Sequence, residues 1–151
     1  MTIRCATAND ETAIRELVFG ILGAYGLKPS PEDTDADLYD LKGHYFDCGG
    51  DFSVLLDKGR IIGTVAIHNS GDGICELRKM YLDPEYHRRG LGRQLFDYSL
   101  GRARELGFRR MTLETASALK EAIALYESYG FKRIEPEHLA PRCDIAMALD
   151  L

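Results

Sequence analysis

The stretch Leu82–Leu95 reads LDPEYHRRGLGRQL, and the rest of the fold can be worked out from it in both directions. The preceding run Ile74–Leu82, ICELRKMYL, predicts a strand that ends before Pro84, because proline cannot donate to a strand ladder. Gly90-Leu91-Gly92 then opens a segment with helical apolar spacing. A strand, a glycine turn and a helix therefore follow one another.

The glycine turn has the features of an anion-binding site. A helix N-terminus exposes unpaired N–H groups and carries about half a positive charge. Gly90 and Gly92 let the backbone approach a ligand closely, so successive N–H groups can surround a phosphate. Arg88, Arg89 and Arg93 add positive charge to the same turn. The alternative is that the two glycines only ease a tight turn.

A dinucleotide-binding turn fits the sequence poorly. That motif needs a third glycine three residues after the second, and this chain has Leu95 there. Residues 78–110 contain nine Arg and Lys and four Asp and Glu, a local charge of +5, whereas the whole chain has a charge of −5. A basic segment in an acidic protein suits a compact polyanion better than a nucleic acid, so we expect no nucleic-acid partner.

On both sides of Leu82–Leu95, short apolar runs alternate with amphipathic segments. Lys58-Gly59 is a hairpin signal between two strands, and Ser117 is a candidate cap for a helix ending at Tyr129. A short helix is expected near 35–45. The order β-α-α-β-β-β-α-β-α-β-β predicts an α/β fold with a mixed, mostly antiparallel sheet of about six to seven strands, flanked by about four helices.

Composition sets further bounds. The length of 151 residues predicts a single domain, 1–151. The opening residues MTIRCATANDE contain no apolar signal-peptide core, and no apolar run approaches the ~20 residues of a membrane span. We therefore expect a cytoplasmic protein without a membrane partner. The four cysteines and four histidines are scattered without metal-ligand spacing, so no metal is expected.

Four motifs together resemble the GNAT superfamily of acyl-CoA-dependent N-acetyltransferases. They are Glu76–Leu82 followed by Pro84-Glu85-Tyr86, the turn His87–Gly92, the strand Met111–Thr115, and Ala122–Phe131 with its tyrosine and Gly-Phe ending. The match is good over about residues 74–134. Two positions depart from the family pattern: His87 stands where Gln or Arg is usual, and Leu119 stands where many members have Asn.

The resemblance implies acetyl-CoA as cosubstrate. The pyrophosphate would lie on the turn, and the pantetheine arm would add to the edge of the strand before it. The implied cofactor-binding residues are Met80, Tyr81, Leu82, His87, Arg88, Arg89, Gly90, Leu91, Gly92 and Arg93.

Two side chains are the expected catalytic residues. Acyl transfer needs an uncharged amine, and a lysine-like amine with a pKa of ~10.4 is about 4.6 kcal/mol from that state at pH 7. Glu76 is the candidate general base, with a surface ion pair to Arg78 or Lys79 as the alternative. Tyr126 is the candidate that stabilises the departing thiolate by hydrogen bonding, with a core tyrosine as the alternative.

The expected activity is acetyl transfer to a primary amine of a small molecule, either an amino acid or a polyamine-like amine, by direct attack in a ternary complex. The acceptor is expected near Tyr25, residues 27–46 and the loop Glu135–Asp144, where Arg142 could hold a substrate carboxylate. Two alternatives stay open: a protein or peptide N-acetyltransferase, and a non-catalytic acyl-CoA-binding module. Family members often dimerise, so a homodimer is an expectation that rests on the resemblance alone.

Overall fold

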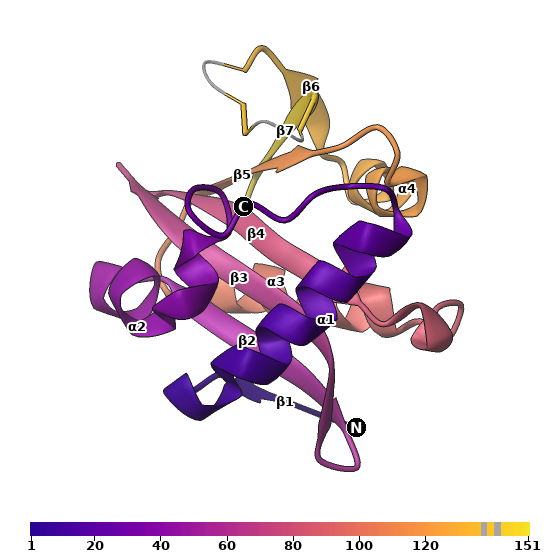
Figure 1. Cartoon of the computed structure of the whole chain (residues 1–151). Helices are drawn as coiled ribbons and strands as arrows, with labels where there is room; N and C mark the ends of the chain where they lie inside the picture. The colour runs from indigo at the N-terminus through magenta and orange to yellow at the C-terminus, as the bar shows by residue number, and fades with distance from the viewer. Residues whose placement is uncertain (137–138, 141–142) are drawn as a thin grey trace.

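A single seven-stranded sheet runs through the molecule in the order β1-β2-β3-β4-β5-β7-β6 (Figure 1). The computed structural model describes residues 1–136, 139–140 and 143–151. The strands are β1 Thr2–Cys5, β2 Asp51–Asp57, β3 Arg60–Gly71, β4 Ile74–Leu82, β5 Arg110–Thr115, β6 Lys132–Ile134 and β7 Ile145–Asp150. The helices are α1 Glu11–Ala24, α2 Leu41–His44, α3 Leu91–Glu105 and α4 Lys120–Ser128.

Neighbouring strands are antiparallel except β4 and β5, which are parallel. A parallel pair needs a crossover connection, and α3 supplies it. The turn between β2 and β3 is Lys58-Gly59, with φ of 50° and 81°, as a two-residue hairpin turn requires. The predicted mixed, mostly antiparallel α/β fold is confirmed.

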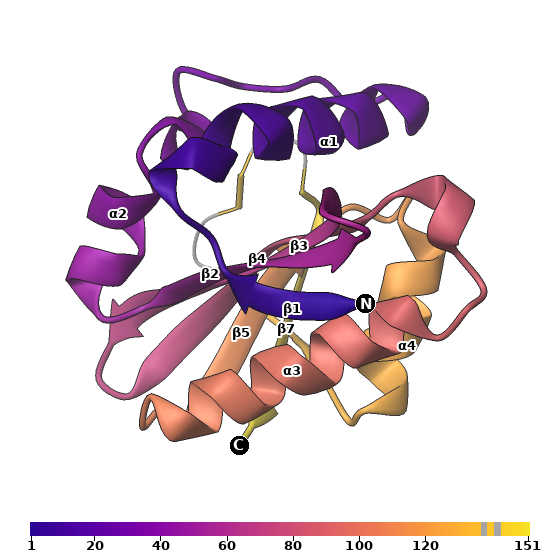
Figure 2. The ribbon, with the colours of Figure 1, turned by 90° about the horizontal axis from the view of Figure 1, so that it is seen from below.

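The helices lie in two layers, one on each face of the sheet (Figure 2). One layer contains α1 and α2, and their core includes Ile14, Val18, Leu22, Leu38 and Phe52. The other contains α3 and α4, and their core includes Leu77, Leu95, Phe96, Met111 and Tyr126. Each fully buried aliphatic or aromatic side chain contributes about 1.5–3 kcal/mol, so both layers are held by apolar burial.

Two local predictions were wrong. The expected helix at 35–45 is a 3-10 turn, Ala36–Tyr39, followed by the single helical turn α2. Asp40 separates them with an extended φ of −156°, and its side chain accepts a hydrogen bond from Gly43 N. Ser117 does not cap α4, which begins three residues later. Its backbone N and its hydroxyl both donate to the Asp144 carboxylate instead, so Ser117 joins two distant segments.

Candidate active site

A cleft opens where β4 and β5 part. Their pairing stops at Leu77 and Leu113, whereas β4 runs on to Leu82 and β5 to Thr115. Two cavities, of about 360 Å³ and 260 Å³, lie along the freed edge of β4. They share the lining residues Met80, Tyr81, Leu119 and Ala122. The two cavities are therefore two ends of one cleft.

A β-bulge in β4 sets which side chains face each end. Arg78 pairs with Ala66 of β3, but Tyr81 pairs with Thr64, so β4 contains one extra residue. Lys79 lies in this bulge with a φ of 50°, and its carbonyl accepts a hydrogen bond from Thr64 Oγ1 at 2.6 Å. A bulge reverses the side-chain alternation beyond it. Met80 therefore packs toward α3 and α4, the face that also holds Leu77.

The smaller cavity ends at the glycine turn. Arg88 and Gly90 have φ of 65° and 76°, and α3 starts at Leu91 with no acidic residue in its first turn. Left-handed residues next to a helix start turn successive N–H groups toward one point. A Cβ added at Gly92 would meet no heavy atom within 4 Å, so its backbone borders open space. The turn has the geometry of an anion-binding site.

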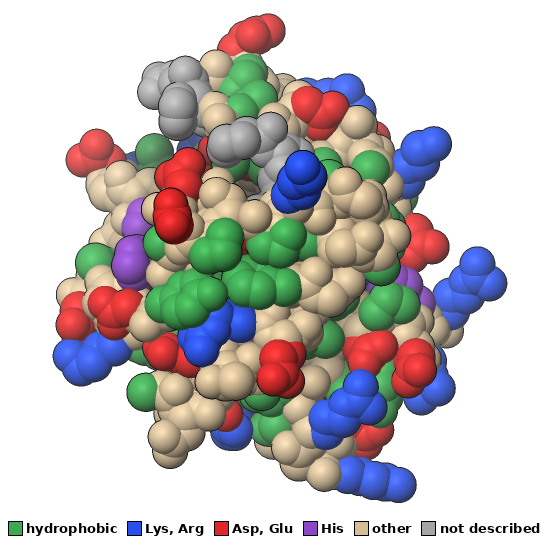
Figure 3. Space-filling view, viewed as in Figure 1, with side chains coloured by type: hydrophobic (Ala, Val, Ile, Leu, Met, Phe, Trp, Pro, Cys, Tyr) green, Lys and Arg blue, Asp and Glu red, His purple; other side chains and the backbone are tan. Residues whose placement is uncertain are grey.

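The residues expected to bind the cofactor divide into three groups. Seven line the smaller cavity: Met80, Tyr81, Leu82, His87, Arg88, Gly90 and Gly92. Arg89 and Arg93 cover aromatic rings, with their guanidinium carbons 5.0 Å from the Tyr86 ring and 5.1 Å from the Tyr129 ring. The Leu91 side chain is buried in the core beneath the turn. Basic side chains project from the edge of the molecule where the connection after β4 lies (Figure 3).

His87 fixes the start of this turn. One ring nitrogen, Nε2, lies 3.2 Å from the carbonyl oxygen of Leu82, and the other, Nδ1, lies 3.7 Å from Glu121 Oε2. The ring thus spans the end of β4 and the first turn of α4. The histidine in place of the family's usual Gln or Arg holds the loop through local contacts.

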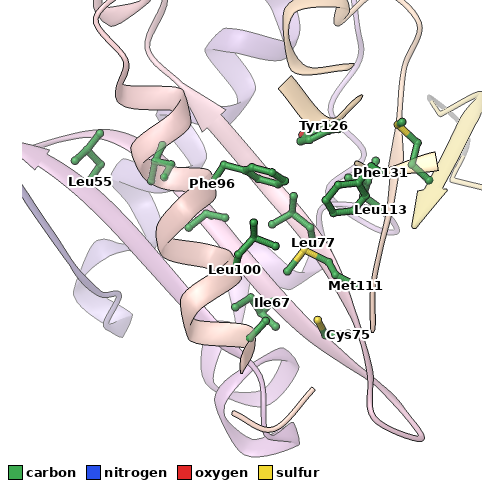
Figure 4. Packing of buried hydrophobic residues seen from close by; sticks show 14 of the residues in the cluster. Leu55, Ile67, Cys75, Leu77, Phe96, Leu100, Met111, Leu113, Tyr126 and Phe131 are labelled. Carbon is green, nitrogen blue, oxygen red and sulfur yellow. The ribbon is translucent and has the colours of Figure 1, made fainter. Parts of the chain in front are cut away.

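Met80 lines both cavities, and the larger of them is also lined by Tyr126. Tyr126 is buried, and it stands on α4 next to Phe96 and Phe131 (Figure 4). Its hydroxyl points to Met80 Sδ at 4.0 Å, across the cleft on β4. Burial raises the pKa of this phenol well above its ordinary value, with a smaller contribution from Tyr81. Tyr126 is therefore a neutral hydrogen-bond donor in the middle of the cleft.

Glu76 and Arg78 form the floor of the larger cavity, on the α1 and α2 side of β4. The Arg78 guanidinium donates through Nε to Glu76 Oε1. The side chain of Glu76 is 17% exposed and that of Arg78 is 37% exposed. The ion-pair alternative for Glu76 is therefore present in the structure, although the pair faces a cavity and not bulk solvent.

Sequence reasoning missed a buried ion cluster behind this floor. Lys79 Nζ lies 3.1 Å from Asp35 Oδ1, 3.4 Å from Asp37 Oδ1 and 3.0 Å from the Thr34 carbonyl oxygen. The Tyr45 hydroxyl donates to Asp37 as well. The alternating acids in Asp33–Asp37 and a lysine within an apolar strand were the available signals. The cluster fixes the loop after α1 over the larger cavity.

The wall of the larger cavity comes from two distant loops. Leu27, Asp33 and Thr34 come from the loop after α1, and Ala140 and Cys143 come from the segment before β7. The expected neighbourhood of the acceptor, residues 27–46 and the last loop, thus supplies part of this wall. Tyr25 instead lines the smaller cavity, with 38% of its surface exposed. Arg142 lies outside the described residues.

The described residues offer neither a metal site nor a membrane-spanning helix. They contain no cluster of three or more His, Cys, Asp or Glu side chains arranged to hold a metal ion. In the same part of the chain, every helix is too short or too polar to cross a bilayer.

Comparisons with known proteins agree with this geometry. The model of the acetyltransferase (GNAT) family matches residues 16–131. The uncharacterized N-acetyltransferase YjgM of Escherichia coli (strain K12) is 37% identical over 138 residues, which cover 88% of this chain and 83% of that protein. A GNAT-family acetyltransferase from Staphylococcus aureus Mu50 superposes with a TM-score of 0.92 at 20% identity, covering 99% of this chain and 98% of that one.

A further solved structure contains the coenzyme. It is yncA of Salmonella typhimurium, described as an acetyltransferase with its cofactor acetyl-CoA, with a TM-score of 0.73 and 26% identity, covering 99% of this chain and 93% of that one. The family match spans most of the chain, and YjgM is similar over most of its length. This chain therefore belongs to the GNAT family and is an N-acetyltransferase.

Proposed function

We propose that this enzyme transfers the acetyl group of acetyl-CoA to a primary amine of a small molecule, by direct attack while both substrates occupy the cleft. The observation that carries the proposal is the shape of the cleft. One continuous space runs from an anion-binding turn, past the Tyr126 hydroxyl, to a pocket with charged side chains. Two substrates can meet there without a covalent enzyme intermediate.

The smaller cavity fits the coenzyme. N–H groups at the start of α3 and Arg88 suit its diphosphate, and the open space at Gly92 leaves room for it. Leu82, Leu95 and Leu125 line the same cavity and suit the pantetheine arm. Tyr25 lies there too, which favours a contact with the coenzyme over the contact with the acceptor expected from the sequence.

Acetyl-CoA supplies an activated acyl group as a thioester. Tyr126 is placed to donate a hydrogen bond at the centre of the cleft, where negative charge develops on the thiolate sulfur. Because burial raises the pKa of Tyr126, full proton transfer from the phenol is uphill, and hydrogen bonding is the role that its environment supports.

Glu76 is the proposed proton acceptor for the amine. It lines the acceptor end of the cleft and is mostly buried, so a substrate ammonium beside it loses part of its hydration. The Arg78 guanidinium fixes one of its oxygens, which orients the carboxylate. Proton transfer runs from the ammonium to Glu76, directly or through one water, before the amine attacks the thioester.

The size of the pocket favours a small acceptor. A cavity of about 360 Å³ is at the small end of the range for small-molecule sites. A peptide acceptor is the second candidate, because the cleft continues to the protein surface at both ends. The single domain 1–151, the cytoplasmic location and the homodimer stay predictions.

Two measurements test this function. Calorimetric titration of acetyl-CoA into the protein should detect binding. Bound acetyl-CoA should also raise the melting temperature of the protein. Release of free thiol from acetyl-CoA should then depend on an added amine, tested with amino acids, polyamines, aminoglycosides and short peptides. Binding without thiol release for any amine would favour the non-catalytic acyl-CoA-binding module.

The Glu76→Gln variant tests the general base. For the best amine of that panel we expect kcat/KM to fall about 100-fold at pH 7, and the deficit to shrink toward pH 9 as more amine is uncharged. Glu105→Gln is the control, because it removes an exposed carboxylate that pairs with Arg102 on α3. Equal activity of Glu76→Gln and the unmodified enzyme from pH 6 to 9 would remove Glu76 from the mechanism.

A further inference from the structure

Arg78 is the cation whose charge reaches the acceptor pocket. Among the described residues that line this cavity, the cationic side chains are Arg78 and Lys79, which are 37% and 6% exposed. The charge of Lys79 is also compensated by its ion pairs with Asp35 and Asp37. We propose that Arg78 binds a carboxylate of the acceptor, and that the acceptor is an amino acid, with its amine and carboxylate close together. This inference rests on the proposed function.

The Arg78 guanidinium has more N–H donors than its two neighbours use. Arginine has five N–H donors in a fixed plane. Nε–H is used by Glu76, and the Tyr45 hydroxyl is a second hydrogen-bonding neighbour. The remaining N–H groups form the part of the fork that can bind a carboxylate with two parallel hydrogen bonds. The two contacts also hold the plane of the fork before substrate arrives.

Arg78 keeps its charge in this setting. Burial opposes the charged form, but Glu76 and Tyr45 outweigh it and raise the pKa of the guanidinium. The pKa of the neighbouring His68 is lowered mainly by burial, and the charge of Arg78 is the second cause. The guanidinium of Arg78 is therefore a charged donor beside the Glu76 carboxylate.

The signs of the charges separate the two kinds of small amine that the sequence left open. Glu76 and Arg78 place a negative and a positive group side by side, and an amino acid zwitterion carries the complementary pair. A polyamine would bring its second cation to the same small cavity, close to Arg78. Asp33 and Glu114 also line the pocket, and they add attraction for the ammonium end.

Matched acceptors test the proposal. Each L-α-amino acid is compared with its carboxamide, which keeps the amine but loses the carboxylate, and with putrescine. We expect KM for the best amino acid to be about 10- to 100-fold below that of its carboxamide, as expected for a charge-assisted hydrogen-bonded pair. Arg78→Gln also removes the partner that orients Glu76, so kcat should fall for both acceptors. Only the amino acid should lose affinity as well, with KM raised by the same factor. Arg78→Lys should recover part of the loss.

Arg110→Gln is the matched control, because Arg110 is a strand arginine in an ion pair with Asp150 and is 40% exposed. It should change neither KM. Acetyl-CoA affinity and the melting temperature are measured for every variant, so that loss of fold or of the coenzyme site is recognised separately. If acetyl-CoA binds but carboxamides or putrescine are better acceptors than every amino acid, this inference is wrong while the proposed function stands. An equal rise of KM for both acceptors in Arg78→Gln also overturns it.

Discussion

The two ends of the cleft are built from different chemistry. At the proposed coenzyme end, we expect the groups that bind the ligand to be mainly backbone N–H groups at the start of α3, where Gly90 and Gly92 line the cavity. At the acceptor end they are side chains, Glu76 and Arg78, backed by the Lys79 ion cluster. The anion-binding turn of the first end is one continuous stretch of sequence, whereas the wall of the second end joins segments as far apart as Leu27 and Cys143.

The difference predicts how each end responds to substitution. A site made of backbone N–H groups tolerates most side-chain substitutions, since its donors belong to the main chain. It does not tolerate a side chain that fills the space between those donors and the ligand. A buried side-chain network depends on every member, because removing one partner leaves another charge without compensation. The three predictions that follow test this contrast.

The largest effect is expected at the acceptor end. Lys79→Met leaves the Asp35 and Asp37 carboxylates buried without their cation, and should lower the free energy of unfolding by about 3–5 kcal/mol. Urea denaturation followed by circular dichroism measures it. Lys42→Met is the control, because the Lys42–Asp47 pair is 79% and 54% exposed, and it should leave the free energy of unfolding nearly unchanged. Similar losses in both variants would contradict a structural role for the buried cluster.

The next effect concerns Tyr126, which lies where the two ends meet. Tyr126→Phe removes the hydroxyl that faces the cleft, and should lower kcat about 100-fold with acetyl-CoA affinity nearly unchanged. Tyr98→Phe is the control, because its hydroxyl lies 3.0 Å from Ser53 Oγ and away from the cleft. An unchanged kcat in Tyr126→Phe would leave Tyr126 as a core residue only.

The pH dependence sharpens the same prediction. Burial raises the pKa of Tyr126, so the neutral, donating form persists as the pH rises through the ordinary phenol range. The kcat of the unmodified enzyme should therefore show no decline caused by Tyr126 up to pH 10. A kcat that falls below that pH in the unmodified enzyme and not in Tyr126→Phe would contradict this assignment.

The smallest effect is expected at the coenzyme end. Gly92→Ala adds a methyl group in open space, so the fold should gain about 0.5–1 kcal/mol from the better helix former. The same methyl group lies where the backbone must approach the diphosphate, and acetyl-CoA should bind about 10-fold more weakly. Gly101 is the control, because it also lies on α3 and a Cβ added there also meets no heavy atom within 4 Å. Gly101→Ala should be stabilised to a similar extent without loss of affinity for acetyl-CoA. Equal affinities in the two variants would place the diphosphate elsewhere.

The sequence predicted the strand, turn and helix around Gly90 well because their determinants are local. The strand end before Pro84, the glycines and the apolar stripe of α3 lie within about thirty residues, and each acts on its own neighbourhood. The predicted order of strands and helices was confirmed for the same reason. The errors at 35–45 and at Ser117 have the opposite cause. Asp144 is a distant partner that takes Ser117 away from α4. Near 35–45, Asp35 and Asp37 pair with the distant Lys79, and Asp40 interrupts the helix with its extended backbone.

What the sequence determined by itself is therefore the succession of strand, turn and helix around Gly90, together with the order of strands and helices that builds one mixed sheet flanked by helices. Only the tertiary structure decided the acceptor end. The bulge at Lys79 reversed the alternation of β4 and aimed Met80 at Tyr126, and it put Arg78 and Lys79 on one face. Charges buried in a medium of low polarity must find partners wherever the fold brings them, and spacing along the chain does not encode that choice.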